Sequence, residues 1–171
     1  MIRATNRLGI RLAVLAGIAL FSLACGGGGG PDSPTSTGVA SVAEVEYLSF
    51  QLANSARSDS HVQPLLDRND EVATIARRHS ESMRDQGFFD HNGPDGSIGA
   101  RLRAAGISFS AAGENLAKLT SASDPAAQAH SMFMSSPEHR QVILDSRFRL
   151  AGVGVARSGS QYWLTQIYIR P

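Results

Sequence analysis

The sequence predicts an α+β fold in which a small antiparallel sheet lies between layers of helix. Apolar residues recur at three- and four-residue spacing over residues 41–57 and 69–86, which indicates two amphipathic helices. Near the C-terminal end, residues 150–156 and 162–169 alternate in side-chain character on either side of turn formers at 158–160, a pattern typical of a β-hairpin. Both faces of the second hairpin strand carry apolar residues, so we expect helices to cover both sides of the sheet.

The two long helices carry polar residues at informative places. Asn54 and Arg57 stand at the end of the first helix, and we expect them to pair with the loop that follows. Asn69 is a good N-cap for the second helix, and acidic residues follow it in the first turn, where the helix dipole favours negative charge. His79 lies on the apolar stripe of the second helix, which favours a hydrogen-bonded core histidine over a metal ligand.

Shorter elements are expected between the second helix and the hairpin. Residues 98–105 predict a short helix that includes Arg101 and Arg103. The alternation of residues 107–110 predicts a strand that leads into the segment Gly-Glu-Asn at 113–115. Asp124 followed by Pro125 is a strong helix start, whereas Pro137 is expected to interrupt that helix, so residues 135–140 are predicted to form a loop.

The segment GFFDHNGPDG, residues 87–96, places a histidine among turn formers. Gly87 is the residue type that ends a helix in the left-handed conformation. Phe88 and Phe89 are expected to pack back against the domain and fix the direction of the loop. Asp, Asn, Gly and Pro then surround His91, which is therefore predicted to be presented on a turn-rich loop.

The N-terminal residues predict an export signal. Residues 1–24 have a basic start followed by an apolar run that is too short for a comfortable permanent membrane span. The segment Ser22-Leu23-Ala24-Cys25 and the five glycines after it resemble a bacterial lipoprotein signal, in which the cysteine carries the lipid. Ser22 departs from that pattern, because leucine is usual three residues before the cysteine. Ordinary signal-peptide cleavage, giving a secreted protein, is the alternative.

Composition defines the remainder of the chain. Cys25 is the only cysteine, so no disulfide can form within the chain. Residues 25–39 are rich in Gly, Pro, Ser and Thr and predict a flexible linker, which leaves residues 40–171 as one domain. Without the three arginines of the signal, the 16 Lys and Arg fall to 13 against 15 Asp and Glu. The slightly acidic balance, with no basic block, argues against nucleic-acid binding.

Nine segments in order resemble one protein family. They begin LANSARS, PLLDRND, ARRHSESM, GFFDHNGPDG and RLRAAG, and continue with GENLA, SPEHR, GVGVA and YWLTQIY. Together they are similar to the bacterial branch of the CAP superfamily, which includes cysteine-rich secretory proteins, antigen 5 and pathogenesis-related proteins. The resemblance covers residues 42–169 and implies a three-stranded antiparallel sheet sandwiched between helices.

The resemblance also implies a cleft. The family places two histidines and two glutamates around it, and some members bind a divalent metal there. By motif, His91 and His139 match the histidines and Glu114 matches one glutamate. The position of the second glutamate falls near Ser136, so this chain lacks it. Asn115 is expected to hold the cleft wall beside Glu114.

The chemistry of this reduced set leaves alternatives open. Neutral imidazoles suit zinc, and a catalytic zinc site usually has three protein ligands and a water. If Glu114 ligates the metal, no general base remains. If Glu114 acts as the base, only His91 and His139 remain as ligands. A serine–histidine pair using Ser135 or Ser136 is a weaker alternative.

We therefore expect an extracytoplasmic, membrane-tethered binding module. Its cleft is expected to bind zinc, another divalent metal or a small envelope ligand, and to be formed by His91, Glu114, Asn115, Ser136 and His139. Its expected partners are the membrane, through lipid on Cys25, and an envelope or extracellular ligand, at the outer membrane or cell surface if the cell is Gram-negative. A hydrolase acting on cell-wall or peptide substrates through His91, Glu114 and His139 is the alternative. Lipid or sterol binding, known for some eukaryotic members, is a third.

Overall fold

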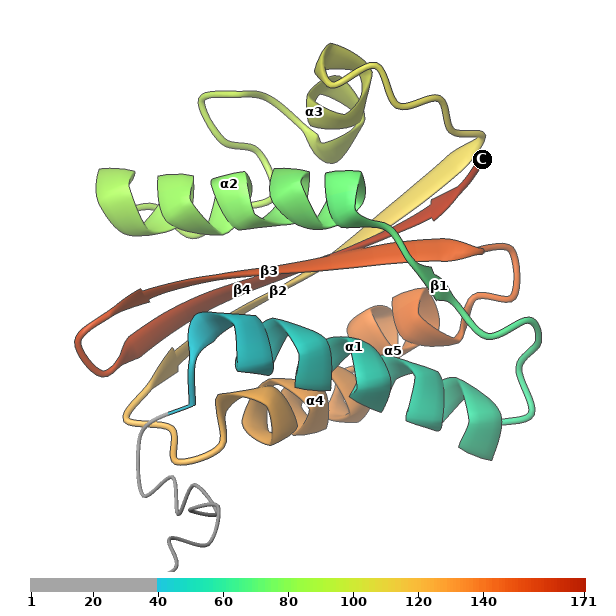
Figure 1. Ribbon diagram of the computed structural model, residues 1–171, viewed down its shortest axis with the longest axis horizontal. Coiled ribbons are helices and arrows are strands. Elements are labelled where there is room, and N and C mark those ends of the chain that lie inside the picture. Colours follow the sequence, from blue (N-terminus) through green and yellow to red (C-terminus); the bar gives the residue numbers. More distant parts are fainter. Residues whose placement is uncertain (1–39) are drawn as a thin grey trace, which may run out of the picture. The chain divides into compact units, whose positions relative to one another are not determined.

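The computed structural model describes residues 40–171, and these form a mixed sheet with helices on both faces (Figure 1). The predicted signal peptide (1–24) and the predicted lipidated cysteine and linker (25–39) lie outside the described residues. Within residues 40–171, no helix has both the length and the hydrophobicity needed for a membrane span.

The sheet has four strands in the order β1-β3-β4-β2. The hairpin strands β3 (Leu150–Ser158) and β4 (Gln161–Arg170) pair antiparallel, and β2 (Ala111–Thr120) pairs antiparallel with the other side of β4. The fourth strand, β1 (Asp67–Arg68), pairs parallel with the start of β3. The expected three antiparallel strands are therefore present, but the expected count was wrong. Two residues are too short to show an alternating pattern, so β1 has no signature in the sequence.

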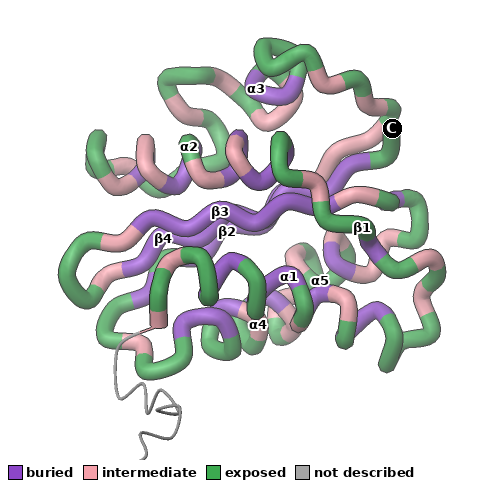
Figure 2. The backbone as a smooth tube through the Cα atoms, in the orientation of Figure 1, coloured by how far each residue is buried: buried purple, intermediate pink, exposed green. Residues whose placement is uncertain are grey.

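Helices cover both faces of this sheet. On one face lie α2 (Asp70–Gln86) and α3 (Ile98–Ala104). On the other lie α1 (Val42–Asp59), α4 (Pro125–Ser135) and α5 (Pro137–Leu144) (Figure 1). Figure 2 shows the strands between them as an almost continuous buried layer, in agreement with the two apolar faces expected for the second hairpin strand.

Local side-chain chemistry explains where the helices begin. Ser41, Asn69 and Asp124 each accept a hydrogen bond from the backbone N–H three residues further on, which satisfies one of the free donors at a helix start. The predicted pairing of α1 with the following loop is confirmed. Asn54 exchanges two hydrogen bonds with the backbone of Leu66, at 2.9 and 2.8 Å.

Two expectations about loops and strands were wrong. Residues 107–110 form no strand, because β4 ends opposite Ala111 and leaves them without a continuous partner. Residues 135–140 are mostly helical rather than a loop. Ser136 separates α4 from α5 and accepts a weak hydrogen bond from the backbone N–H of His139, at 3.5 Å. Pro137 begins α5 at a position where a missing N–H has no cost.

Two glycines of β3 bring α2 directly onto the sheet. A Cβ atom added to Gly152 would lie 2.2 Å from the backbone N of Ala73, and one added to Gly154 would lie 1.9 Å from the backbone N of Arg77. These distances leave no room for any side chain. The close approach sets the height of α2 above the sheet, and with it the position of the loop that follows α2.

A buried glutamate joins the two helical layers at the edge of the sheet. Glu46 of α1 accepts a hydrogen bond from the backbone N–H of Val155 at 3.0 Å and pairs with Arg77 of α2 at 2.6 Å. The short strand β1 leaves this part of β3 without a neighbouring strand. Glu46 therefore covers an edge donor that would otherwise be available to another strand.

Candidate functional site

The loop after α2 rests on a buried histidine. His79 is fully buried, and its Nε2 donates a hydrogen bond to the carbonyl O of Asp90 at 3.0 Å. Burial lowers the pKa of His79, and the Nε2–H donor leaves Nδ1 unprotonated in the neutral ring. The edge of the ring packs against Phe88, with the ring centroids 5.9 Å apart. The expectation of a hydrogen-bonded core histidine is confirmed.

Backbone turns complete this loop. Gly87 ends α2 in the left-handed conformation, with φ of 72°, as predicted. The backbone N–H of Asn92 donates to the carboxylate of Asp90 at 2.7 Å, and Gly93 and Gly96 exchange backbone hydrogen bonds. Both Phe88 and Phe89 were expected to pack against the domain, but only Phe88 does so. Phe89 is 47% exposed, so the expectation was wrong for this residue.

The loop brings His91 to a buried ion pair. The side chain of His91 is 54% exposed, and its Nδ1 lies 3.7 Å from Oε1 of Glu114, on β2. Nη2 of Arg101, on α3, donates to both oxygens of Glu114 at 2.7 Å and to the carbonyl O of His91 at 3.1 Å. The side chains of Arg101 and Glu114 are only 3% and 2% exposed. Burial raises the pKa of the Glu114 carboxyl, while Arg101 and His91 oppose that rise.

Arg101 was not predicted as a site residue. The sequence contains one signal that could have found it. Ile98, Arg101 and Leu102 share one face of the short helix by their spacing, so an arginine stands among residues expected to face the core. A buried charge is costly unless it is paired, and Glu114 is the carboxylate that pairs with Arg101.

The remaining predicted site residues lie on the other side of β2. Asn115 follows Glu114 in the strand, so its side chain points to the opposite face of the sheet. Its Nδ2 donates to the carbonyl O of His139 on α5 at 3.1 Å. The ring of His139 packs edge-on against Phe133 of α4, with centroids 5.3 Å apart. Asn115 thus holds the backbone of the α5 segment, and its place in a cleft wall stays a prediction.

The five predicted cleft residues therefore form two groups within residues 40–171. His91 and Glu114 meet on the α2–α3 side, and Asn115, Ser136 and His139 meet on the α4–α5 side. No ion pair or hydrogen bond joins the two groups in this part of the chain. A single cleft that uses all five residues stays a prediction.

The donor set fits a metal poorly in this arrangement. Both oxygens of Glu114 accept from the guanidinium of Arg101, whose charge would repel a cation held by the same carboxylate. The residues described here contain no group of three or more His, Cys, Asp or Glu placed to hold a metal ion. We therefore derive no chemistry through a metal, and metal binding at His91 and His139 stays a prediction.

The serines and the other histidines have local roles. The hydroxyl of Ser135 donates to the carbonyl O of Met132, and that of Ser136 donates to Glu138. His61 is exposed in a turn. His130 is half-buried on α4, where burial lowers its pKa. His61 is thus a surface residue and His130 a packing residue of α4.

Comparison with known proteins establishes the family. The model of the cysteine-rich secretory protein family, CAP, matches residues 50–168. The chain belongs to the CAP family. The uncharacterized protein YkwD of Bacillus subtilis (strain 168) is 34% identical over 133 residues, which are 77% of this chain and 50% of YkwD.

Solved structures agree with this assignment. The crystal structure of an extracellular protein containing an SCP domain, from Bacillus anthracis, matches with a TM-score of 0.63 and 31% identity. The match covers 84% of this chain and 45% of that protein. An outer surface protein of Borrelia burgdorferi matches with a TM-score of 0.69 over 77% of this chain and 96% of its own, but with 12% identity it shows the shared fold alone. The chain spans half or less of YkwD and of the Bacillus anthracis protein.

Proposed function

We propose that this CAP domain is an extracytoplasmic binding module tethered to the membrane through lipid on Cys25, and that it recognises its ligand beside His91, Glu114 and Arg101. The similar Bacillus anthracis structure is described as an extracellular protein, which supports the location. The apolar N-terminal run and the single cysteine support export and lipidation.

The ion pair between Glu114 and Arg101 is the observation that favours a binding function over hydrolysis. A general base must be within reach of the proton that it removes. The carboxylate of Glu114 is paired with Arg101 at 2.7 Å and is only 2% exposed, so it is screened from a substrate proton. His91, in contrast, is exposed on a loop that His79 holds in place. The site therefore offers a fixed imidazole to a ligand rather than an available acid/base pair.

A hydrolase is the second candidate, because His91 lies 3.7 Å from Glu114 and a rearranged Arg101 would leave these two as an acid/base pair. The test is turnover of peptidoglycan and casein by the purified protein, compared with its His91→Ala and His139→Ala variants. The proposal predicts no turnover that depends on either histidine. Turnover that is lost in either variant while the melting temperature is unchanged would establish the hydrolase instead.

The tether has a separate test. Cys25→Ala in the full chain is expected to move the protein from the membrane fraction to the soluble fraction, because the only acceptor for lipid is removed. An unchanged distribution would refute lipidation at Cys25. It would leave the binding proposal to be decided by the turnover assay.

A further inference from the structure

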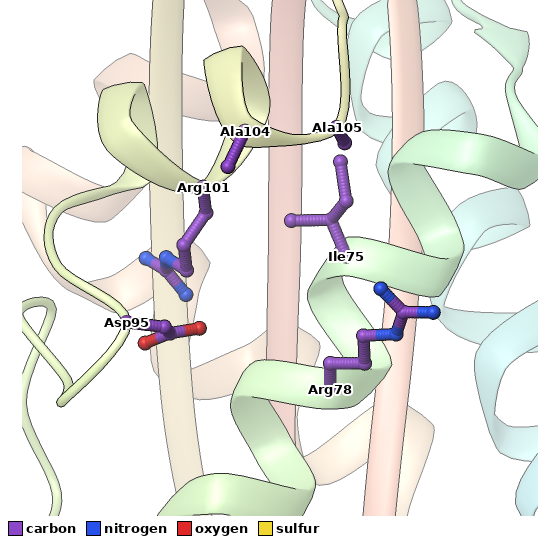
Figure 3. A pocket seen from close by; sticks show the side chains of 6 residues that line it. All are labelled: Ile75, Arg78, Asp95, Arg101, Ala104 and Ala105. Atoms are coloured by element: carbon purple, nitrogen blue, oxygen red, sulfur yellow. The ribbon is translucent and has the colours of Figure 1, made fainter.

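A pocket between α2 and α3 lies next to the buried ion pair and brings together two arginines and one aspartate. Its volume is about 250 Å³, which is small for a ligand site and suits a ligand of few atoms. Figure 3 shows Arg101 and Asp95 on one side of the pocket and Arg78 on α2 on the other. Ile75, Ala104 and Ala105 add small aliphatic surface.

Arg101 has unused hydrogen-bonding capacity at this pocket. Its Nη2 serves Glu114 and His91, but its Nε and Nη1 have no hydrogen-bond partner within residues 40–171, although the residue is only 5% exposed. Buried donors without a partner are rare and costly in folded proteins. Both atoms are closed to solvent in this structure, so an acceptor group in the pocket would reach them, and remove that cost, once the Arg101 side chain turns towards it.

Arg78 provides a second positive charge at the rim. Unlike Arg77 and Arg84 of the same helix, Arg78 has no ion-pair partner among the described residues. Two guanidinium groups facing one cavity favour an anion, and the planar fork of arginine favours a carboxylate or a phosphate.

Asp95 decides between these anions. Its carboxylate is 42% exposed and lies 3.9 Å from the unprotonated Nδ1 of the buried His79, which cannot donate to it in the neutral ring. A phosphate would place two or three charged oxygens beside Asp95 and be repelled. A ligand with one carboxylate and an adjacent N–H would instead use the arginines and Asp95 together, and a small side chain would meet the aliphatic residues.

We propose that this pocket binds the free carboxyl end of a short peptide that ends in a small aliphatic residue. The terminal carboxylate pairs with Arg78 and Arg101, the last amide N–H donates to Asp95, and the terminal side chain contacts Ile75, Ala104 and Ala105. This assignment deepens the proposed function, on which it rests, by naming a ligand class for the binding module.

The experiment is an NMR titration of the full chain carrying Cys25→Ala, with N-acetyl-alanyl-alanine as the probe. Three comparison ligands are used: the same peptide with its C-terminal carboxylate replaced by an amide, free alanine, and acetate. The peptide acid is expected to shift the backbone amide signals of Ile75, Ala104 and Ala105 in a saturable way, whereas the peptide amide is expected to do so much more weakly.

Arg78→Gln is expected to weaken the affinity for the peptide acid about tenfold, since it removes one charge-assisted contact. Arg84→Gln, which removes the same charge from α2 outside the pocket, is expected to leave the affinity unchanged.

Asp95→Asn is expected to weaken the peptide acid, whose N–H loses its charged acceptor, but not acetate, whose binding should rise because a negative charge beside the anion is removed. Equal binding of peptide acid and acetate would reduce the pocket to an anion site and overturn the assignment. Tighter binding of free alanine would assign the pocket to amino acids, and absence of any saturable shift would remove it as a ligand site. These outcomes are independent of the turnover and fractionation tests, so failure here is distinguishable from failure of the proposed function.

Discussion

Removal of the Arg101 side-chain charge is expected to be among the most damaging single changes to this domain. In Arg101→Met, Glu114 keeps its buried position but loses the donor that serves both of its oxygens at 2.7 Å. Breaking one side of a buried ion pair costs about 3–5 kcal/mol. At about 4 °C per kcal/mol for a domain of this size, the melting temperature should fall by roughly 12–20 °C.

The cost should depend on pH in a defined direction. Without Arg101, only His91 opposes the effect of burial, so the pKa of Glu114 rises further above the unfolded value of about 4.3. The folded variant then binds a proton more readily than the unfolded chain does. Its stability relative to the natural protein therefore recovers as the pH falls towards that raised pKa. Urea unfolding at about pH 7.5 and about pH 5 measures the difference.

Two further variants make this prediction refutable. The double variant Arg101→Met/Glu114→Met removes both charges and is expected to cost less than Arg101→Met alone, because no unpaired carboxylate remains. The same series in a His91→Ala background removes the imidazole that lies 3.7 Å from Glu114. A double variant as unstable as the sum of the two single variants, or a cost independent of pH, would show that the pair is not coupled as described.

Three other outcomes are expected. Gly154→Ala should lower the stability by about 3 kcal/mol or more, because the new Cβ would lie 1.9 Å from the backbone N of Arg77. Gly99→Ala should be tolerated, because its nearest contact is the flexible end of Arg103. Denaturant unfolding compares the two variants, and equal stabilities would contradict the described packing. Burial lowers the pKa of His79, so its contribution to the free energy of unfolding should be complete above the unfolded pKa of about 6.5 and be lost as the pH falls through the folded pKa. His79→Gln should flatten this dependence of stability on pH. A stability profile unchanged in the variant would contradict the prediction. If His91 and His139 form a metal site, calorimetric titration with zinc should show binding that the His91→Ala/His139→Ala variant loses. Binding retained by the variant would assign the metal to other residues.

The predictions that succeeded concern contacts between residues close together in the chain. Asn69 and Asp124 cap helices by bonding to the N–H three residues ahead, as predicted, so the local sequence is sufficient to place these starts. The β3–β4 hairpin was predictable for the same reason, since its strands are joined by a short turn. His79 was predicted as a core residue from its place on an apolar stripe.

The predictions that failed, and the features that were missed, depend on partners far away in the chain. Residues 107–110 have a strand-like pattern but no continuous neighbouring strand, and the two residues of β1 have a neighbour but no pattern. The sequence pattern does not single out Glu46 of α1, yet it covers the edge of β3 and pairs with α2. A strand or a buried charge exists only where its partner does, and the partner is set by the assembled layers.

The amino-acid sequence by itself determined the starts of α2 and α4, the hairpin, the family and the choice of His91 and Glu114 as candidate site residues. Only the tertiary structure decided that Arg101 holds Glu114, and that His91 and His139 approach β2 from opposite faces of the sheet. Periodicity tells which side of a helix or strand is buried, but it does not tell which charged groups meet there. That depends on the height of α2 above the sheet, which the glycines of β3 set by admitting the backbone of this helix to direct contact.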